Sequence, residues 1–182
     1  MTSLVGLSGS LRLYSFNSGL LRAAVGEMPE GSTLEIGSIA EIPLYNGDVE
    51  AVGIPVPVSA LKERIAAADG LLLVTPEYNN GIPGVFKNAI DWLSRPSRDI
   101  ARIFGGKPVA VIGASPGGFG TILSQAAWLP VLRTLGAQHW AGDRLMVSRA
   151  GQAFDAEGNL TDESVRQHLT TYLARFVAHV SG

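Results

Sequence analysis

Side chains that can bind an anion are concentrated in one stretch near the start of the chain, residues 8–17. This first loop offers several serine hydroxyls, the guanidinium of Arg12 and the amide of Asn17, directly before a segment with helical periodicity. The start of a helix presents free backbone N–H groups and a positive dipole end, and arginine adds a fork of donors suited to phosphate oxygens. The alternative is a capped helix start with a surface arginine. Because the donors outnumber those that a cap needs, we expect an anion site.

The first loop lacks the two commonest nucleotide-binding patterns. It does not follow G-x-G-x-x-G, the fingerprint of dinucleotide-binding folds. It is not a P-loop either, because no Gly-Lys-Ser/Thr follows the glycines. The loop therefore predicts an anion site and disfavours these two classes of nucleotide.

Two further loops are rich in Ser, Gly, Asn and Pro. The second loop, residues 75–83, has prolines near both ends, and its backbone and asparagines can hydrogen-bond the edge of a planar ring. Tyr78 can pack on an apolar face of the same ligand. The third loop, residues 113–121, has three glycines within four residues, so that a ligand can lie close to the backbone. Each loop alone also fits a plain strand-to-helix turn, and it is their combination that indicates a binding site.

Alternating strands and helices place these loops. Apolar runs predict strands at 4–7, 33–36, 71–74 and 109–112, and an irregular last strand within 137–147. Helical spacing predicts helices at 19–25, 61–68, 85–93, 122–135 and 165–180, with Pro130 expected to kink or split the fourth. Residues 42–58 are interpreted as one long connection. The pattern predicts an α/β domain over residues 1–182, in which a parallel sheet covered on both faces brings the three loops to one edge.

Composition excludes several other classes of function. The net charge is −2 and the pI about 5.9, so no basic excess is present for binding nucleic acid or an anionic membrane. The chain has no cysteine, which excludes disulfides, cysteine-ligated metals and thiol catalysis. Its three histidines lack metal-ligand spacing. No apolar run approaches the roughly 20 residues of a membrane span, and no signal peptide is visible, so we expect a cytoplasmic protein.

Three motifs, taken in order, resemble the NADPH-dependent FMN reductase family, which includes bacterial quinone, chromate and azo-dye reductases. They are G-S-x-R-x-x-S-x-N at residues 9–17, P-E-Y-N at 76–79 and K-N-A-I-D-W at 87–92. The resemblance covers nearly the whole chain. It implies a flavodoxin-like fold whose five-stranded parallel sheet has the order 2-1-3-4-5.

The resemblance also implies a function. The protein would bind FMN non-covalently, take a hydride from NADPH or NADH, and reduce a quinone-like or other small acceptor. No catalytic acid or base is expected, because the flavin carries the chemistry. Family members are usually homodimers or homotetramers. The residues implied to bind the cofactor are Ser10, Arg12, Ser15, Asn17 and Ser18 at the phosphate, Pro76, Glu77, Tyr78 and Asn79 along the isoalloxazine ring, and Ser115, Gly117 and Gly118 at its other edge.

One position departs from the pattern of the family. Asn80 stands where many quinone and chromate reductases of the family carry an aromatic residue, which puts the substrate class and the assembly in question.

The alternative functions are an electron carrier and a binding module. A flavodoxin-type electron carrier would bind FMN without oxidising NAD(P)H itself, but such carriers are typically more acidic than this chain. A flavodoxin-like module that has lost its flavin is opposed by the intact loops.

Overall fold

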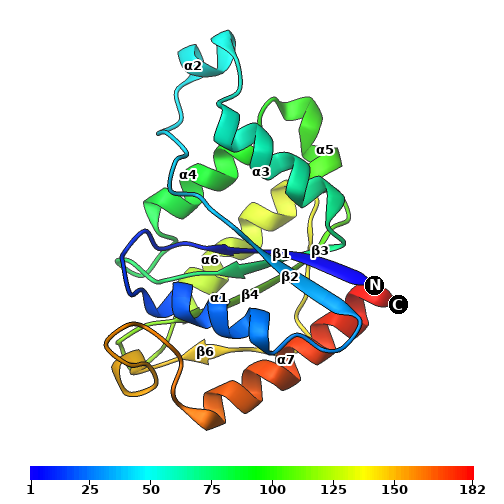
Figure 1. Cartoon of the computed structure of the whole chain (residues 1–182). Coiled ribbons are helices and arrows are strands. Elements are labelled where there is room, and N and C mark those ends of the chain that lie inside the picture. The colour runs from blue at the N-terminus through cyan, green and yellow to red at the C-terminus, as the bar shows by residue number, and fades with distance from the viewer.

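The computed structural model describes all 182 residues as one parallel sheet between two layers of helices (Figure 1). The strands are β1 (Thr2–Ser8), β2 (Ser32–Gly37), β3 (Gly70–Val74), β4 (Pro108–Ala114), β5 (Gln138–His139) and β6 (Met146–Val147). Their order is β2-β1-β3-β4-β5. β5 pairs with the first residues of β4, and β6 pairs with the last residues of β4. The predicted flavodoxin-like order is therefore confirmed, and the irregular last strand consists of two short pieces.

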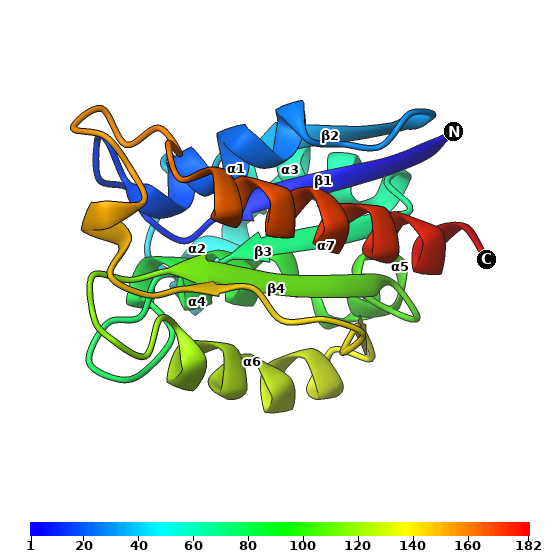
Figure 2. The same ribbon diagram turned by 90° about the horizontal axis from the view of Figure 1, so that it is seen from below.

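The helices divide between the two faces because successive strand residues point to opposite sides. Leu72 and Val74 pack with α1 (Phe16–Gly26) and α7 (Glu163–Ser181), which lie side by side in front of the sheet in Figure 2. Leu71 and Leu73 pack on the opposite face with α3 (Val56–Ala67), α4 (Gly84–Leu93), α5 (Ile100–Ile103) and α6 (Ile122–Thr134). None of these helices combines the length and the apolar character that crossing a bilayer requires.

The structure corrects one prediction about helices and one part of another. We expected residues 42–58 to form one long connection, but they contain α2 (Gly47–Val52) and the start of α3. Pro57 lies in the first turn of α3, where the missing N–H removes no hydrogen bond. Pro130 was expected to kink or split α6, and it does not split it, because the buried Trp128 and Leu132 hold the helix against the sheet on both sides of the proline.

Residues 42–55, called the α2 arm below, extend away from the sheet at the top of Figure 1. No residue of α2 is buried. The base of the arm is fixed to α4 by hydrogen bonds from the Asn88 Nδ2 and the Trp92 Nε1 to the Pro43 carbonyl, both 2.9 Å long. The backbone N–H of Tyr45 also donates to Asn88 Oδ1 at 2.8 Å. Glu50 of α2 also forms an ion pair with Arg95, at 3.8 Å. The arm therefore has a defined position although its helix buries no residue.

Candidate functional site

Eight of the twelve residues expected to bind the cofactor line one cavity of about 360 Å³ at the carboxyl ends of β1, β3 and β4. The eight are Ser10, Arg12, Ser15, Asn17, Pro76, Glu77, Tyr78 and Ser115. Ser18 lies on the other side of the first loop, in a neighbouring cavity that Ser10 and Arg12 also line. Asn79, Gly117 and Gly118 line neither cavity. The sheet thus brings all three loops to one site, as expected of an open parallel sheet.

The start of α1 forms one end of this cavity. Ser15 is the N-cap, and its hydroxyl accepts a hydrogen bond from the Ser18 N–H at 3.4 Å. The preceding amides of Phe16 and Asn17 belong to the first helical turn, where the helix itself offers no acceptor. These N–H groups and the positive end of the helix dipole form a site suited to a phosphate.

Arg12 adds the only cation that lines the cavity. Its Nη2 donates to the Tyr14 carbonyl at 3.1 Å, and its guanidinium lies 5.2 Å from the centre of the Phe16 ring. No carboxylate forms a salt bridge with it; the nine ion pairs of the protein involve other residues. The positive charge is therefore held beside the start of α1 and is not neutralised by the protein.

Asn17 lines the cavity and also joins the first loop to the third. Its Nδ2 donates to the Ala114 carbonyl at 2.8 Å, and its Oδ1 accepts from the Ala114 N–H at 2.9 Å. The side chain is buried, and both of its polar atoms are used on the end of β4. Its contact with a phosphate would therefore come through its backbone N–H and the second amide proton.

A tight turn shapes the second loop. Tyr78 and Gly81 exchange two backbone hydrogen bonds of 3.1 Å, and Asn79 and Asn80 between them have φ angles of 50° and 62°. This is the pattern of a type I′ turn, which needs positive φ at both central residues and favours asparagine there. The turn gives a backbone reason for Asn80, because an aromatic residue would tolerate this conformation less well.

Glu77 has a partner outside its own loop. Its Oε2 accepts hydrogen bonds from the backbone N–H groups of Leu123 at 2.8 Å and Ser124 at 3.0 Å, in the first turn of α6. The carboxylate thus lines the cavity and is engaged by a helix that begins after the third loop. The sequence predicted its place in the site, but not this contact.

Backbone contacts from β6 and from the residues that follow it support the third loop. Ser115 donates its N–H to the Val147 carbonyl and accepts from the Ala150 N–H, both at 3.0 Å. The Gly117 carbonyl accepts from the Arg149 N–H at 3.0 Å. Ser115 is thereby fixed at the cavity wall, whereas Gly117 and Gly118 form the exposed bend above it.

Three residues of the cavity wall were not among the expected ones: Phe16, Ala114 and Pro116. Ala114 and Pro116 lie within the third loop that the sequence singled out, so their position was signalled although their side chains were not. Phe16 likewise lies within the first loop, but its ring packs 5.3 Å from that of Phe154, a contact with a distant part of the chain that no local pattern reveals. No group of three or more His, Cys, Asp or Glu side chains could hold a metal ion.

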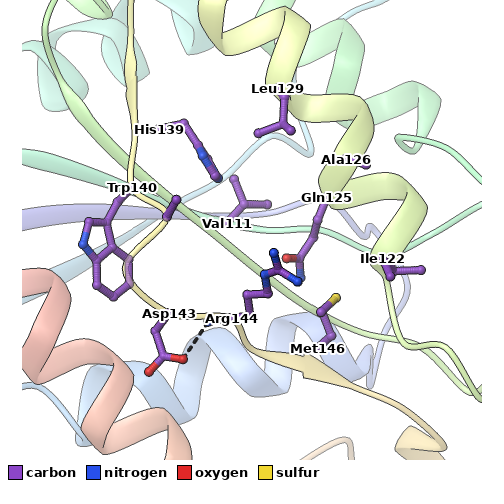
Figure 3. Close-up of a pocket in the computed structure, with 11 residues that line it drawn as sticks. Val111, Ile122, Gln125, Ala126, Leu129, His139, Trp140, Asp143, Arg144 and Met146 are labelled. Carbon is purple, nitrogen blue, oxygen red and sulfur yellow. Dashed lines mark hydrogen bonds between the residues drawn. The ribbon is translucent and has the colours of Figure 1, made fainter.

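A second cavity of similar volume, about 360 Å³, opens on the far side of β4, between α6 and the two pieces of the last strand (Figure 3). Its wall is mostly apolar, with Gln125, His139, Asp143 and Arg144 as polar members. Partial burial there lowers the pKa of His139. Ile122, the first residue of α6, lines it, but the next two amides of that helix are already bonded to Glu77. None of the expected binding residues is present, so this cavity does not compete with the first one as the phosphate site.

Comparison with known proteins identifies relatives of this chain. The model of the NADPH-dependent FMN reductase family matches residues 2–152. An NAD(P)H-dependent FMN reductase of Pseudomonas aeruginosa is 47% identical over 163 residues, which cover 90% of this chain and 86% of that protein. The quinone reductase of Escherichia coli is 39% identical over 176 residues, covering 94% and 92% of the two chains.

A solved structure shows the same arrangement of elements. FerB, a flavoenzyme NAD(P)H:(acceptor) oxidoreductase from Paracoccus denitrificans, superposes with a TM-score of 0.88 at 34% sequence identity. The match covers 100% of this chain and 98% of that one. The three loops described above therefore lie on a fold that is shared with a flavoenzyme over its whole length.

Proposed function

Because the chain belongs to the NADPH-dependent FMN reductase family, we propose that it binds FMN in the cavity at the ends of β1, β3 and β4 and catalyses electron transfer from NAD(P)H to a small acceptor. The family match covers most of the chain, and relatives at 38–47% identity carry the corresponding names.

The observation that carries this proposal is the pairing of two unlike ends in one cavity. One end holds the free amides of the α1 start and the unpaired Arg12, which suit a phosphate. The other end holds the buried Pro76 and the rigid turn at Tyr78, which suit a flat, largely apolar ring. A mononucleotide with a planar base analogue fits both ends, whereas a free phosphate or a free aromatic ring would use only one.

Different residues of the cavity would bind the phosphate and the ring. Ser10, Arg12, Ser15 and the first-turn amides of α1 would hold the phosphate, with Ser18 supporting the loop through its hydroxyl, 3.0 Å from that of Ser8. Pro76, Tyr78 and Ser115 would border the ring. FMN, when bound, supplies a centre that accepts a hydride and passes electrons on. The protein's part is to bind and orient it, and the cavity wall offers no histidine for proton transfer.

For the acceptor we propose a quinone-like molecule. The relatives include a 2-hydroxy-1,4-benzoquinone reductase of a Burkholderia species, 38% identical over 172 residues, and the quinone reductase of Escherichia coli. A flat quinone could occupy the open side of the cavity beside Tyr78, which is half exposed. The use of NAD(P)H also favours the cytoplasm as the place where the enzyme works.

We further propose that the protein forms a homodimer or homotetramer. The α2 arm supports this, because its helix buries no residue and its Val52 side chain is 93% exposed. Leu44 near the start of the arm and Val56 directly after its end are 80% and 81% exposed. A fixed, apolar projection of this kind gains stability when a second copy covers it.

The experiment for the proposed activity is a steady-state screen of the purified, FMN-loaded protein. NADPH and NADH are each offered with benzoquinones, free FMN, an azo dye and chromate. We expect turnover with at least one nucleotide and the highest kcat/KM with a quinone. Binding of FMN without turnover of any nucleotide would point to an electron carrier, and absence of FMN binding would remove both functions.

A further inference from the structure

The second loop is joined to α6 by side chains that the proposed chemistry does not use. The Thr75 hydroxyl lies 2.8 Å from that of Ser124, and both are buried. The Trp128 Nε1 donates to the same Thr75 oxygen at 3.1 Å. Glu77 adds the two hydrogen bonds from the amides of Leu123 and Ser124. The start of α6 and residues 75–77 therefore form one hydrogen-bonded unit beneath the wall of the cavity.

The start of α6 depends on Glu77 because it lacks a cap from its own chain segment. Thr121 occupies the N-cap position, but its side chain makes no capping hydrogen bond. Its hydroxyl instead accepts from the Gln125 Nε2 at 3.1 Å. The Glu77 carboxylate takes over the amides that an N-cap side chain normally satisfies, and its negative charge faces the positive end of the helix dipole.

We propose that Glu77 is a positioning residue, whose carboxylate caps α6 from the second loop and so fixes the ring-side wall of the cofactor cavity. Glu77 directly precedes Tyr78, where the type I′ turn begins. The hydrogen bonds that hold Glu77 to α6 therefore determine the position of this turn at the cavity. The proposal rests on the flavin function above, and it assigns the carboxylate to the helix rather than to proton transfer.

The first test compares the binding of two flavins. FMN and riboflavin share the ring, but only FMN has the phosphate. We expect Glu77→Ala to weaken both flavins by a similar factor, about tenfold, as the loss of a charged helix cap suggests. Glu77→Gln keeps one acceptor oxygen and should recover part of the affinity. Arg12→Ala is the matched control, because it should weaken FMN far more than riboflavin.

The second test needs no flavin. In the cofactor-free protein, the Glu77→Ala substitution should speed hydrogen exchange at the amides of Leu123 and Ser124, with Glu77→Gln intermediate and the central strands unchanged. Unchanged exchange at these amides, or unchanged riboflavin affinity in a folded Glu77→Ala protein, would overturn the proposal. A chain that binds no flavin at all, yet shows the faster exchange, would refute the flavin function and leave the capping contact established.

Discussion

Arg12 stands apart among the charged residues of the protein, because it lines the cavity and has no carboxylate partner. Replacing Arg12 with alanine should raise the Kd for FMN about 10- to 100-fold, since a charged hydrogen bond is worth roughly 1.5–3 kcal/mol. The Kd of Arg12→Lys for FMN should fall between those of the wild type and of Arg12→Ala, because lysine keeps the charge and loses the planar fork. Titration followed by flavin fluorescence measures both.

The exposed position of Arg12 makes this a clean comparison. Its side chain makes one hydrogen bond to the protein, to the neighbouring Tyr14 carbonyl, so the melting temperature of the cofactor-free variant should be close to that of the wild type. Equal FMN affinity in the wild type and in Arg12→Ala would contradict the assignment of the α1 start as the phosphate site.

Single residues also show how far the site could be predicted from the sequence. Ser10, Arg12 and Ser15 lie within a few positions of the helix that they serve, so local pattern was enough to place them. Asn17 and Glu77 were placed in the site, but their partners lie 97 and 46 residues further along the chain. Such contacts depend on how the loops meet at the sheet edge, which no local pattern of residue types encodes.

At the scale of elements, the close approach of β4 to the second loop can be tested at Gly113. A Cβ built there would lie 2.1 Å from the Thr75 carbonyl oxygen and 2.5 Å from Thr121 Oγ1. Gly113→Ala must therefore push the second and third loops apart. We expect a loss of about 1–3 kcal/mol in the free energy of unfolding, typical of overpacking, together with weaker FMN binding. Urea unfolding and flavin titration measure the two effects.

Gly118→Ala is the control for this prediction. It lies in the same loop, and a Cβ there would meet nothing within 4 Å. Its unfolding free energy should stay within about 0.5 kcal/mol of the wild type, as for other unstrained surface substitutions. If Gly113→Ala were as stable as Gly118→Ala, this would contradict the close packing described between the ends of β3 and β4.

The elements themselves were predicted where burial leaves a pattern. Continuous apolar runs marked β3 and β4, which are covered on both faces, and a periodic stripe marked α7. The α2 helix was missed because it buries no residue and so has no apolar stripe. The start of α3 was missed because Pro55 and Pro57 were interpreted as loop residues, although proline is well tolerated at the start of a helix.

At the scale of the whole molecule, the exposed apolar residues of the α2 arm, together with Val56 directly after it, predict an effect on assembly. Replacing Leu44, Val52 and Val56 with serine should shift the protein from an oligomer towards a monomer, because apolar area that a second copy would cover is lost. Sedimentation velocity over a range of concentrations measures this. A wild type that is monomeric at every concentration would contradict the proposed assembly.

The carboxylates of the whole molecule predict how its stability depends on pH. Hydrogen bonds are the largest influence on the pKa of six carboxyl groups and hold it below the usual range: Glu27, Glu63, Asp69, Asp99, Asp155 and Asp162. A lowered folded-state pKa means that the unfolded chain binds more protons in acid. The stabilisation is therefore complete above about pH 5, and it is lost as the pH falls below about 4.

Urea unfolding at neutral pH and in acid measures this loss, and Asp162 offers a matched variant. Its carboxylate caps α7 by accepting from the Ser164 and Val165 amides at 2.9 and 3.1 Å. Asp162→Asn keeps a capping oxygen but cannot be protonated in this range. The variant should lose less stability on acidification than the wild type, and an identical loss would contradict this role of Asp162.

The central claim, that this chain binds FMN and oxidises NAD(P)H through it, is tested most directly by anaerobic reduction. The FMN-loaded protein is mixed with one equivalent of NADPH, and in parallel with NADH, and the visible flavin absorbance is followed. We predict that at least one nucleotide bleaches the flavin within the time of a turnover, and that adding benzoquinone restores the colour. A bound flavin that neither nucleotide bleaches would contradict the account.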